Sequence, residues 1–461
     1  MKGPALSVAL LSLAGTAWAT HAQSPAAPIP PPAAPASATA PEPFDPAIWQ
    51  GRPGVFVGTR GCTNGLCHGA SGAQERGDIR GDEHTVWLAD PHRDAARALD
   101  TVAAAAMSRA LGLGPPQAAQ LCLDCHSISA PENLRDGLSP ASGISCEGCH
   151  GPAGGWVARH MEPAWPRERS LALGMVDLRD LAVRTQQCAR CHVGSGRRAV
   201  DHRLIAAGHP VLRFELDNYT ASLPRHWRLG GVRRDGSPRA AEHGVRAWAV
   251  AQASTFAAAL GVMAAQAAGP GPWPEFSQLS CRSCHHDLKA GRWRTQAGYV
   301  YRGGQPPWSP ARWLALAVLS AEIDPRLATS IADRVEVLAT RLRAFAPRTE
   351  VTEAARALVP DLQDLAARMA ASDWPSSRVR RLIRALAADR ERLLAADVAS
   401  AEQVYWGLRT LVAELTASGV EPVDGALTRA LDAVYRDLAD PDTVDRSALG
   451  RHLEALENVA R

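Results

Sequence analysis

Residues 146–150 read Cys-Glu-Gly-Cys-His. This CxxCH pattern recurs at residues 122–126, 188–192 and 281–285, and a copy with four residues between the cysteines occupies residues 62–68. CxxCH is the attachment signature of c-type haem. Its two thiols bind the porphyrin covalently, and the histidine becomes the proximal ligand of the iron. The sequence therefore predicts five covalent haem c groups.

The five motifs account for all ten cysteines of the chain. The cysteines predicted to bind haem are Cys62, Cys67, Cys122, Cys125, Cys146, Cys149, Cys188, Cys191, Cys281 and Cys284. The predicted proximal ligands are His68, His126, His150, His192 and His285. Zinc sites favour CxxC halves without a fixed histidine after each, and a disulfide framework does not explain five trailing histidines. The first motif has the longest gap, but the cysteine count leaves Cys62 and Cys67 no other partners.

The first 22 residues have the pattern of a secretory signal peptide. Lys2 supplies a positive charge, residues 5–14 are apolar, and Ala17-Trp18-Ala19 fits a cleavage site, with Ala22 as a later alternative. The apolar run is too short to span a membrane. Since c-type haem is attached outside the cytoplasm, we expect the mature protein in a bacterial periplasm.

The composition is that of a globular protein, with 461 residues and a hydrophobic fraction of 46%. The formal charge of +3 implies no nucleic-acid partner. Only Lys2 and Lys289 are lysines, so 50 basic residues minus 2 leaves 48 arginines. Two explanations of this arginine bias stay open. One is the base composition of the genome, and the other is the pairing of planar guanidinium groups with haem propionates.

The chain divides into regions of different character. Residues 23–48 form a linker rich in proline and alanine. Residues 49–305 contain all five motifs and many glycines and prolines, so we expect a pentahaem cytochrome c domain with little regular structure between the motifs. Within it we expect helices at residues 94–111 and 242–268. Residues 247–269 carry no charge, and we favour a helix buried against haem over a membrane span, so we expect no integral membrane segment in the mature chain.

Residues 306–461 contain no cysteine, and His452 is their one histidine. Apolar residues recur there at helical spacing, for example Ile331, Val335, Leu338 and Leu342. The pattern predicts a bundle of five to seven helices that binds no cofactor and folds as a separate unit. The prolines expected to mark helix starts or breaks are Pro325, Pro347, Pro360, Pro375, Pro422 and Pro441. The predicted fold class is therefore mainly α, a multihaem domain followed by a helical bundle.

Several segments within residues 58–290 resemble the multihaem cytochrome c-552/c-554 family. Residues 143–152 read Gly-Ile-Ser-Cys-Glu-Gly-Cys-His-Gly-Pro, with His160 ten residues after the motif histidine. Residues 87–95, which include Trp87 and His92, are similar to the family's Trp-then-His-x-x-Ala segment. Ala206-Ala-Gly-His-Pro and Cys284-His-His-Asp-Leu resemble longer relatives of the group. The chain departs from the family in its fifth motif, its long first gap and its added helical region.

Each haem iron also has a distal position. Fifteen histidines minus five proximal ligands leaves ten, and His21 and His452 lie outside the motif region. The eight remaining candidates are His84, His92, His160, His202, His209, His226, His243 and His286. His286 directly follows a proximal ligand, so it cannot reach the same iron from the other side. We expect it either to ligate a neighbouring haem or to donate a hydrogen bond near its own haem. Four methionines, Met107, Met161, Met175 and Met263, occur in no recognisable ligand context.

The resemblance implies crossed ligation. It pairs His160 with the first haem, on His68, and His92 with the third haem, on His150. We expect His209 or His202 at the fourth or fifth haem. The family also leaves its second haem without a protein distal ligand, which implies an open iron on His126. The competing expectation is that one of the unassigned histidines, His84, His202, His226 or His243, folds back onto that iron.

Three functions fit these features. The first is electron transfer through five haems to redox partner proteins. The second is a redox enzyme that acts on a small nitrogen compound at a five-coordinate second haem, on His126. The third is a scaffold role through the helical region. Pentahaem nitrite reductases use a lysine at the catalytic haem, and no Cys-x-x-Cys-Lys occurs here. Hydroxylamine oxidoreductases use a tyrosine crosslink, and none of the five tyrosines has a matching context. We therefore favour electron transfer over catalysis.

Overall fold

The computed structural model describes most of the chain after residue 52. The described residues are 53–64, 67–73, 80–134, 137–196, 198–227, 244–281, 284–285, 308–440 and 444–461. The expected signal peptide and proline-rich linker lie outside them. Helices form the regular structure of the described residues, and the pairing between extended segments is limited to two isolated bridges, Ser195 with Arg198 and Leu279 with Trp308. The predicted mainly α fold class is confirmed.

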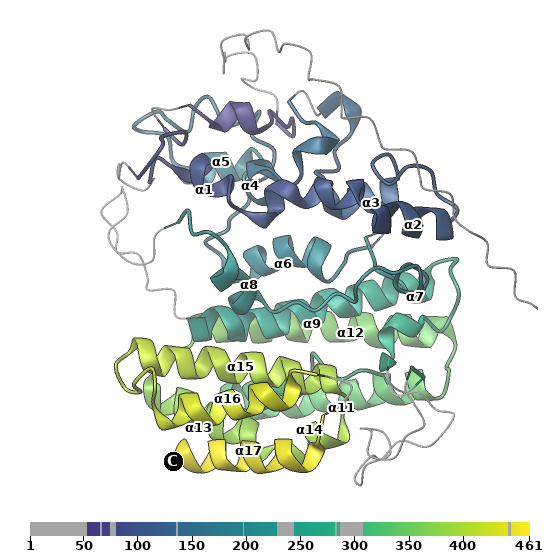
Figure 1. Cartoon of the computed structure of the whole chain (residues 1–461), viewed down its shortest axis with the longest axis vertical. Helices are drawn as coiled ribbons and strands as arrows, with labels where there is room; N and C mark the ends of the chain where they lie inside the picture. Colours follow the sequence, from purple (N-terminus) through teal and green to yellow (C-terminus); the bar gives the residue numbers. More distant parts are fainter. Residues whose placement is uncertain are drawn as a thin grey trace, which may run out of the picture. The chain divides into compact units, whose positions relative to one another are not determined.

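The helices of the motif-bearing half are mostly shorter than those of the other half, except for α9 with its 25 residues (Figure 1). The motif-bearing half contains α1 (Glu83–Trp87), α2 (Val102–Ala110), α3 (Gln120–His126), α4 (Cys146–His150), α5 (Arg167–Ala172), α6 (Leu181–His192), α7 (His202–Ala206), α8 (Leu216–Ser222) and α9 (Gly244–Ala268). The other half contains α10 (Leu314–Ile323), α11 (Pro325–Arg343), α12 (Arg348–Ala371), α13 (Ser376–Ala388), α14 (Arg390–Ala395), α15 (Val398–Ala417), α16 (Ala426–Leu438) and α17 (Arg446–Val459). Short 3₁₀ helices are η2 (Thr59–Cys62), η3 (Pro91–Asp100), η4 (Glu132–Leu134), η5 (Pro140–Ser142) and η6 (Phe276–Gln278).

The helix expected at residues 94–111 is divided in the structure. A 3₁₀ helix, η3, covers its first part and the α-helix α2 follows. Thr101 lies between them with extended backbone, and its hydroxyl accepts a hydrogen bond from the backbone N–H of Ala104 at 3.1 Å. A threonine in this position starts a new helix rather than continuing the old one.

The helix expected at residues 242–268 is α9 over its described part, Gly244–Ala268. It is apolar on all sides, and sixteen of its residues are buried. By length and composition α9 is the one helix among the described residues that could cross a membrane, and 78% of its most apolar stretch is buried. A helix that is apolar all round needs neighbours on every side. It packs against α12, α15 and α10, and against α6 and α8 of the motif-bearing half.

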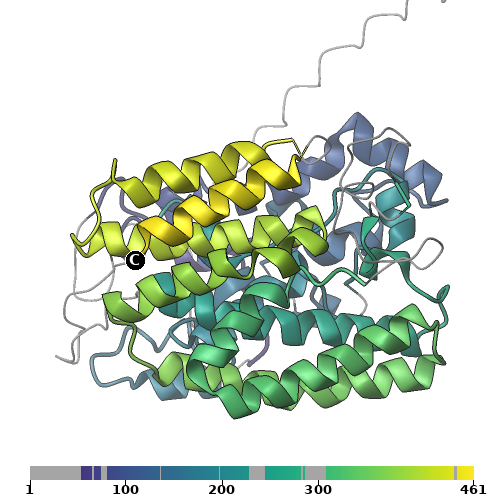
Figure 2. The same cartoon turned by 90° about the horizontal axis from the view of Figure 1, so that it is seen from below.

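Residues from 308 onward form eight helices in the described part, compared with the five to seven expected. The additional element is short: α14 has only six residues, between α13 and α15. Figure 2 shows these helices, drawn in green to yellow, lying roughly antiparallel in a bundle. Aspartates cap several of them, for example Asp324, whose carboxylate accepts the backbone N–H groups of Arg326 and Leu327 at 3.0 Å.

Most prolines of this region lie at helix boundaries, as predicted. Pro325 is the first residue of α11, and Pro347 and Pro375 directly precede α12 and α13. Pro422 lies in the connection between α15 and α16. Pro441 lies outside the described residues.

Pro360 is the exception. It lies inside α12, so the prediction that it marks a helix start or break is wrong. Leu358 and Leu362 on either side of it are fully buried. Packing of this apolar face holds the helix together across the proline.

The hydrophobic core extends across the boundary expected at residue 306. Trp248, Phe256 and Met263 of α9 belong to the same buried cluster as the leucines of α11 to α17. Residues 45–461 also group as one compact unit. The helix α9 therefore packs as part of the helical bundle, while it contacts the motif-bearing half through α6 and α8.

Candidate functional site

Helix geometry explains how three of the motifs present their side chains. The second and third motifs form α3 and α4, and the fourth forms the last turn of α6. Residues three and four apart lie on one face of a helix. Both cysteines and the histidine of each of these motifs are therefore directed to the same side.

Each motif histidine lies opposite one other histidine. The distances between ring centroids are 6.3 Å for His68 and His160, 6.4 Å for His126 and His209, 6.4 Å for His150 and His226, 5.9 Å for His192 and His92, and 6.1 Å for His285 and His202. Ten different histidines take part and none is used twice. The four partners named from the sequence, His92, His160, His202 and His209, all belong to these pairs.

The histidine pairing in the structure differs from the pairing that the family resemblance implies at the second and third motifs. His160 lies opposite His68 as expected, and His202 lies opposite the fifth motif's His285. His92 lies opposite His192 of the fourth motif, and not opposite His150. His92 is the second residue of η3, which contacts α3 of the second motif, and α3 lies beside α6. This route brings His92 to the fourth motif.

The expected open position at the second motif is also different in the structure. His209 follows α7, and its ring lies opposite His126. The position opposite His150 is taken by His226. His226 is one of the eight candidates, but no family segment surrounds it, and only its place between α8 and α9 could have suggested that it returns to the motifs. His243 and His286 lie outside the described residues.

Two histidines of the described residues lie outside these pairs. His84 stacks on Trp87 at a centroid distance of 5.7 Å. Burial and the charge of Arg93 lower the pKa of His84. His452 in α17 has its Nδ1 2.6 Å from Oδ2 of Asp437. These contacts give both residues local structural roles.

The Nδ1 atoms of several paired histidines have acceptors. Nδ1 of His68 lies 3.1 Å from Oε2 of Glu83, and Nδ1 of His92 lies 2.9 Å from Oδ1 of Asp90. Backbone carbonyls serve the others: Ala95 O lies 2.8 Å from His126 Nδ1, Val157 O lies 2.6 Å from His160 Nδ1, and Pro210 O lies 2.8 Å from His209 Nδ1. An acceptor at Nδ1 leaves Nε2 as the metal-binding nitrogen.

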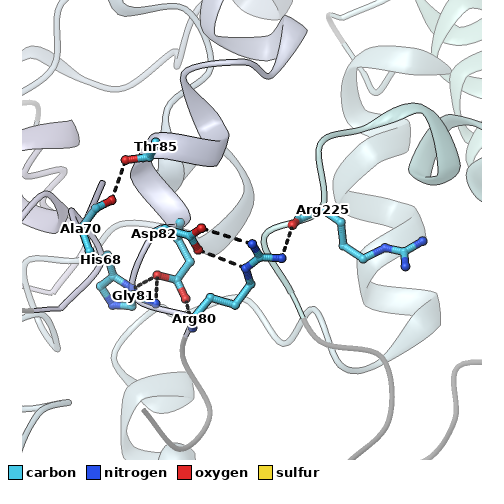
Figure 3. A network of polar contacts seen from close by, with 8 residues as sticks. His68, Ala70, Arg80, Gly81, Asp82, Thr85 and Arg225 are labelled. Atoms are coloured by element: carbon cyan, nitrogen blue, oxygen red, sulfur yellow. Dashed lines mark hydrogen bonds and ion pairs between the residues drawn. The ribbon is translucent and has the colours of Figure 1, made fainter. Parts of the chain in front are cut away.

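Figure 3 shows the polar network around His68. Glu83, which accepts from the imidazole, also accepts the backbone N–H groups of Arg80 at 2.6 Å and Gly81 at 3.0 Å. Arg80 directs its guanidinium to both oxygens of Asp82, at 3.0 and 3.2 Å, and to the carbonyl of Arg225 at 3.1 Å (Figure 3). Arg225 directly precedes His226 in the chain. One network therefore holds the ligand histidine of the first motif and the segment that supplies the partner of the third.

Glu147, between the cysteines of the third motif, joins the first and third motifs. Its carboxylate accepts the backbone N–H groups of Val57 at 3.0 Å, Gly58 at 2.8 Å and Ala153 at 2.8 Å. The residue is only 2% exposed. Burial raises the pKa of Glu147, and the three N–H donors oppose that shift. The chain segment before the first motif is thus fixed to the third.

Further contacts place the motifs in the order first, third, fourth, second, fifth. The sulfur atoms of Cys62 and Cys146 lie next to each other, as do those of Cys125 and Cys191. The third and fourth motifs meet where Nε2 of Gln187 donates to the carbonyl of Gly148 at 2.5 Å. The residues that face the second and fifth motifs, His209 and His202, are only seven positions apart, on α7 and the turn after it.

The fourth motif has aromatic neighbours. The ring of His192 stacks on Phe214 at 5.3 Å and contacts Tyr219 edge-on at 5.2 Å. Arg312, which shortly precedes α10, donates to the carbonyl of Phe214 at 3.2 Å. Burial lowers the pKa of Arg312 to about 10. These contacts place two aromatic rings beside the fourth site and a buried guanidinium behind one of them.

Helix α8, which contains Tyr219 and closely follows Phe214, is fixed to α15 of the helical bundle. Oγ1 of Thr410 donates to Oδ2 of Asp217 at 2.8 Å, and Arg409 donates to Oδ1 of Asn218 at 2.9 Å. Arg213 and Glu402 add an ion pair between the same regions. The bundle therefore supports the wall of the fourth site.

The pKa values of the buried motif histidines suit metal ligands. Burial, with smaller contributions from the charges of His226 and His68, lowers the pKa of His150 to about 4. Burial and His92 lower the pKa of His192 to about 4. Both imidazoles are neutral at pH 7, and neutral imidazole is the form that binds a metal.

Residues 65–151 match the family model described as cytochrome c554 and c-prime. The matched segment contains the end of the first motif, the whole second and third motifs, and the residues of the network in Figure 3 from Ala70 to Thr85. No curated protein and no solved structure matches the chain. The match supports a c-type cytochrome with covalently bound haem c.

Proposed function

We propose that this chain is a five-haem electron-transfer cytochrome whose irons are each held between two histidines. The observation that carries the proposal is the set of five imidazole pairs, each of which joins one motif histidine to a histidine from elsewhere in the chain. In each pair, the motif histidine directly follows the second cysteine of its motif in the sequence. Every cysteine and ten of the fifteen histidines are used in this arrangement.

The spacing of the rings fits a haem iron. A metal–nitrogen bond of about 2 Å on each side, plus about 1.1 Å from each nitrogen to its ring centroid, separates two axial imidazoles across one iron by about 6.2 Å. The five measured separations lie between 5.9 and 6.4 Å. The donor set fits as well, because two thiols and two neutral imidazoles are the groups that attach and ligate haem c.

Two histidines at each iron favour electron transfer over catalysis. When bound, haem c supplies a one-electron carrier, and a filled sixth position leaves no room for a substrate on the iron. The alternative, an enzyme acting on a small nitrogen compound at the second haem, requires an open iron on His126. His209 lies opposite that histidine at 6.4 Å, which argues against the alternative.

The contacts between motifs support a single route through the protein. Neighbouring motifs in the order first, third, fourth, second, fifth are joined by Glu147, by Gln187, by the Cys125–Cys191 contact and by the segment between His202 and His209. The first and fifth sites are then the two ends of the route, where redox partner proteins exchange electrons with it. Attachment of haem c outside the cytoplasm and the signal-like N-terminus support a periplasmic location.

The proposal is tested by the mass of the purified protein and by carbon monoxide binding. We expect five covalent haem additions and no change in the Soret band when carbon monoxide is added to the fully reduced protein. Four additions would show that one of the five motifs does not bind haem, and the Cys62–Cys67 site with its longer gap would be the first candidate. A Soret change in one haem would show an open iron and favour the enzyme.

A further inference from the structure

The Nδ1 acceptors of the ligand histidines are of two kinds, carboxylates and backbone carbonyls. Among contacts between described residues, two of the paired imidazoles have a carboxylate at Nδ1: His68 with Glu83 and His92 with Asp90. The acceptors of three others, His126, His160 and His209, are backbone carbonyls. The carboxylates belong to the first and the fourth site.

The first carboxylate, Glu83, is held in place by the chain itself. It accepts two backbone N–H groups, from Arg80 and Gly81, in addition to the imidazole. Figure 3 shows that the neighbouring Arg80 guanidinium is directed to Asp82 and Arg225. The side chain of Glu83 is 17% exposed, so water screens its charge only in part.

The second carboxylate, Asp90, is more deeply buried. One oxygen, Oδ1, accepts both the backbone N–H and Nδ1 of His92 at 2.9 Å. The side chain is 7% exposed. As the N-cap of η3, Asp90 is fixed relative to the imidazole two residues later.

A carboxylate acceptor changes the ligand as well as fixing its orientation. It draws the Nδ1 proton toward itself and makes the imidazole a more basic ligand. Its negative charge, in partly desolvated surroundings, also stabilises the more positive ferric iron. A neutral backbone carbonyl can accept the same hydrogen bond from Nδ1, but it changes the basicity of the imidazole and the stability of the ferric iron much less.

We propose that Glu83 and Asp90 lower the reduction potentials of the first and fourth haems relative to the same sites with a neutral acceptor. This inference rests on the proposed function, a cytochrome with five histidine-ligated haems. It goes beyond that proposal by naming the residues that set the reduction potentials of two of the haems. Glu83 and Asp90 are positioning residues that act through His68 and His92.

The cleaner test is Asp90→Asn in the full haem-loaded chain. The amide oxygen can keep both hydrogen bonds that Oδ1 accepts, while the charge is removed. A redox titration followed optically should show one haem whose reduced-to-oxidised ratio at fixed potential rises at least tenfold, which is a shift of about 59 mV for a one-electron couple. Glu83→Gln should shift a different haem in the same direction, and the double variant should shift two.

Asp180→Asn is the matched control. Asp180 caps α6, the helix of the fourth motif, and accepts the backbone N–H groups of Ala182 and Val183 at 2.8 and 3.0 Å. This variant removes a carboxylate at the opposite end of the helix that carries the fourth motif, where it accepts from backbone groups instead of an imidazole. It should change the reduced-to-oxidised ratio of every haem by less than threefold. Asp90→Glu, which retains the charge, should restore most of the wild-type value.

Low-temperature EPR separates this inference from the proposed function. If the wild type has five low-spin haems and neither Asp90→Asn nor Glu83→Gln moves any potential, the inference is wrong and the five-haem proposal stands. A high-spin signal in Asp90→Asn would mean that the carboxylate only holds His92 in place, which also overturns the inference. Fewer than five low-spin haems in the wild type would reject the proposed function itself.

Discussion

Gly407→Ala tests whether α9 and the C-terminal helices share one core. Gly407 lies in α15, and a Cβ atom at this position would be 2.4 Å from the Cζ2 and 2.9 Å from the Cε2 of Trp248 in α9. The indole is fully buried, with 0% exposure. Carbon atoms in contact are about 3.5–4.0 Å apart, so the indole or one of the helices has to move.

The magnitude follows from two opposing effects. Replacing glycine by alanine inside a helix stabilises the helix by about 1 kcal/mol. Overpacking of a core costs about 1–3 kcal/mol, and the upper half of that range applies here because the core encloses Trp248 completely. We therefore expect Gly407→Ala to lower the free energy of unfolding by about 1–2 kcal/mol.

Gly261→Ala is the matched control. Gly261 also lies inside a long helix, α9, but apart from the backbone of its own helix no atom lies within 4 Å of the position that a Cβ would occupy. This change should stabilise the protein by about 0.5–1 kcal/mol. Urea unfolding followed by the far-ultraviolet helical signal measures both. Trp248→Phe should relieve part of the clash, so a double-mutant cycle with Gly407→Ala should give a favourable coupling above about 1 kcal/mol. Equal stabilisation by both alanines would refute the shared core.

Three further changes test other parts of the structure. His209→Ala should open the second haem, so that carbon monoxide shifts the Soret band of one haem in five; an unchanged spectrum would show that His209 is not the ligand opposite His126. Glu147→Gln should leave one buried N–H donor facing an amide nitrogen, at a cost of about 1–3 kcal/mol in urea unfolding, and an unchanged midpoint would contradict the role of its carboxylate. Burial raises the pKa of Glu215 from its ordinary 4.5 to about 7, so the native state binds more protons than the unfolded state between these values. Stability should therefore fall as pH rises through this window, by at most about 3 kcal/mol, and Glu215→Gln should flatten the dependence.

The sequence predicts the local features of the site well. Each motif encodes both cysteines and one ligand within a short stretch of chain, so these residues need no long-range information. His160 can be identified because a motif and its surroundings repeat a family segment. The long helix α9 is predictable almost to the residue, since every position from Ala247 to Ala268 is uncharged.

Sequence reasoning fails at the long-range pairing. The partners of His126 and His150 come from residues 209 and 226, which are 83 and 76 positions away along the chain. Nothing in the local sequence fixes how the segment after α6 returns to the motifs. Packing of α8 on α15, through Thr410 and Asp217, holds the part of this segment between His209 and His226, and side-chain contacts of this kind have no periodic signal.

The boundary expected at residue 306 follows the cysteine content, whereas the hydrophobic core is continuous across it. After Arg246, α9 has neither a cysteine nor a charge, so its sequence looks the same whether the helix packs on haem or in a helical bundle. Its neighbours α12 and α15 lie about 100 residues or more further along the chain, so local sequence does not reveal them. Whether residues 306–461 fold alone stays a prediction. The shared core suggests that a fragment beginning at Gly244 is more stable than one beginning at 306.

Low-temperature EPR of the oxidised wild-type protein tests the central claim most directly, because it distinguishes irons with two strong axial ligands from five-coordinate irons. The five histidine pairs predict low-spin ferric signals that integrate to five haems per chain, with no high-spin component. A high-spin signal equivalent to one haem per chain would contradict this arrangement, because one of the five imidazole pairs would then not hold an iron between its rings.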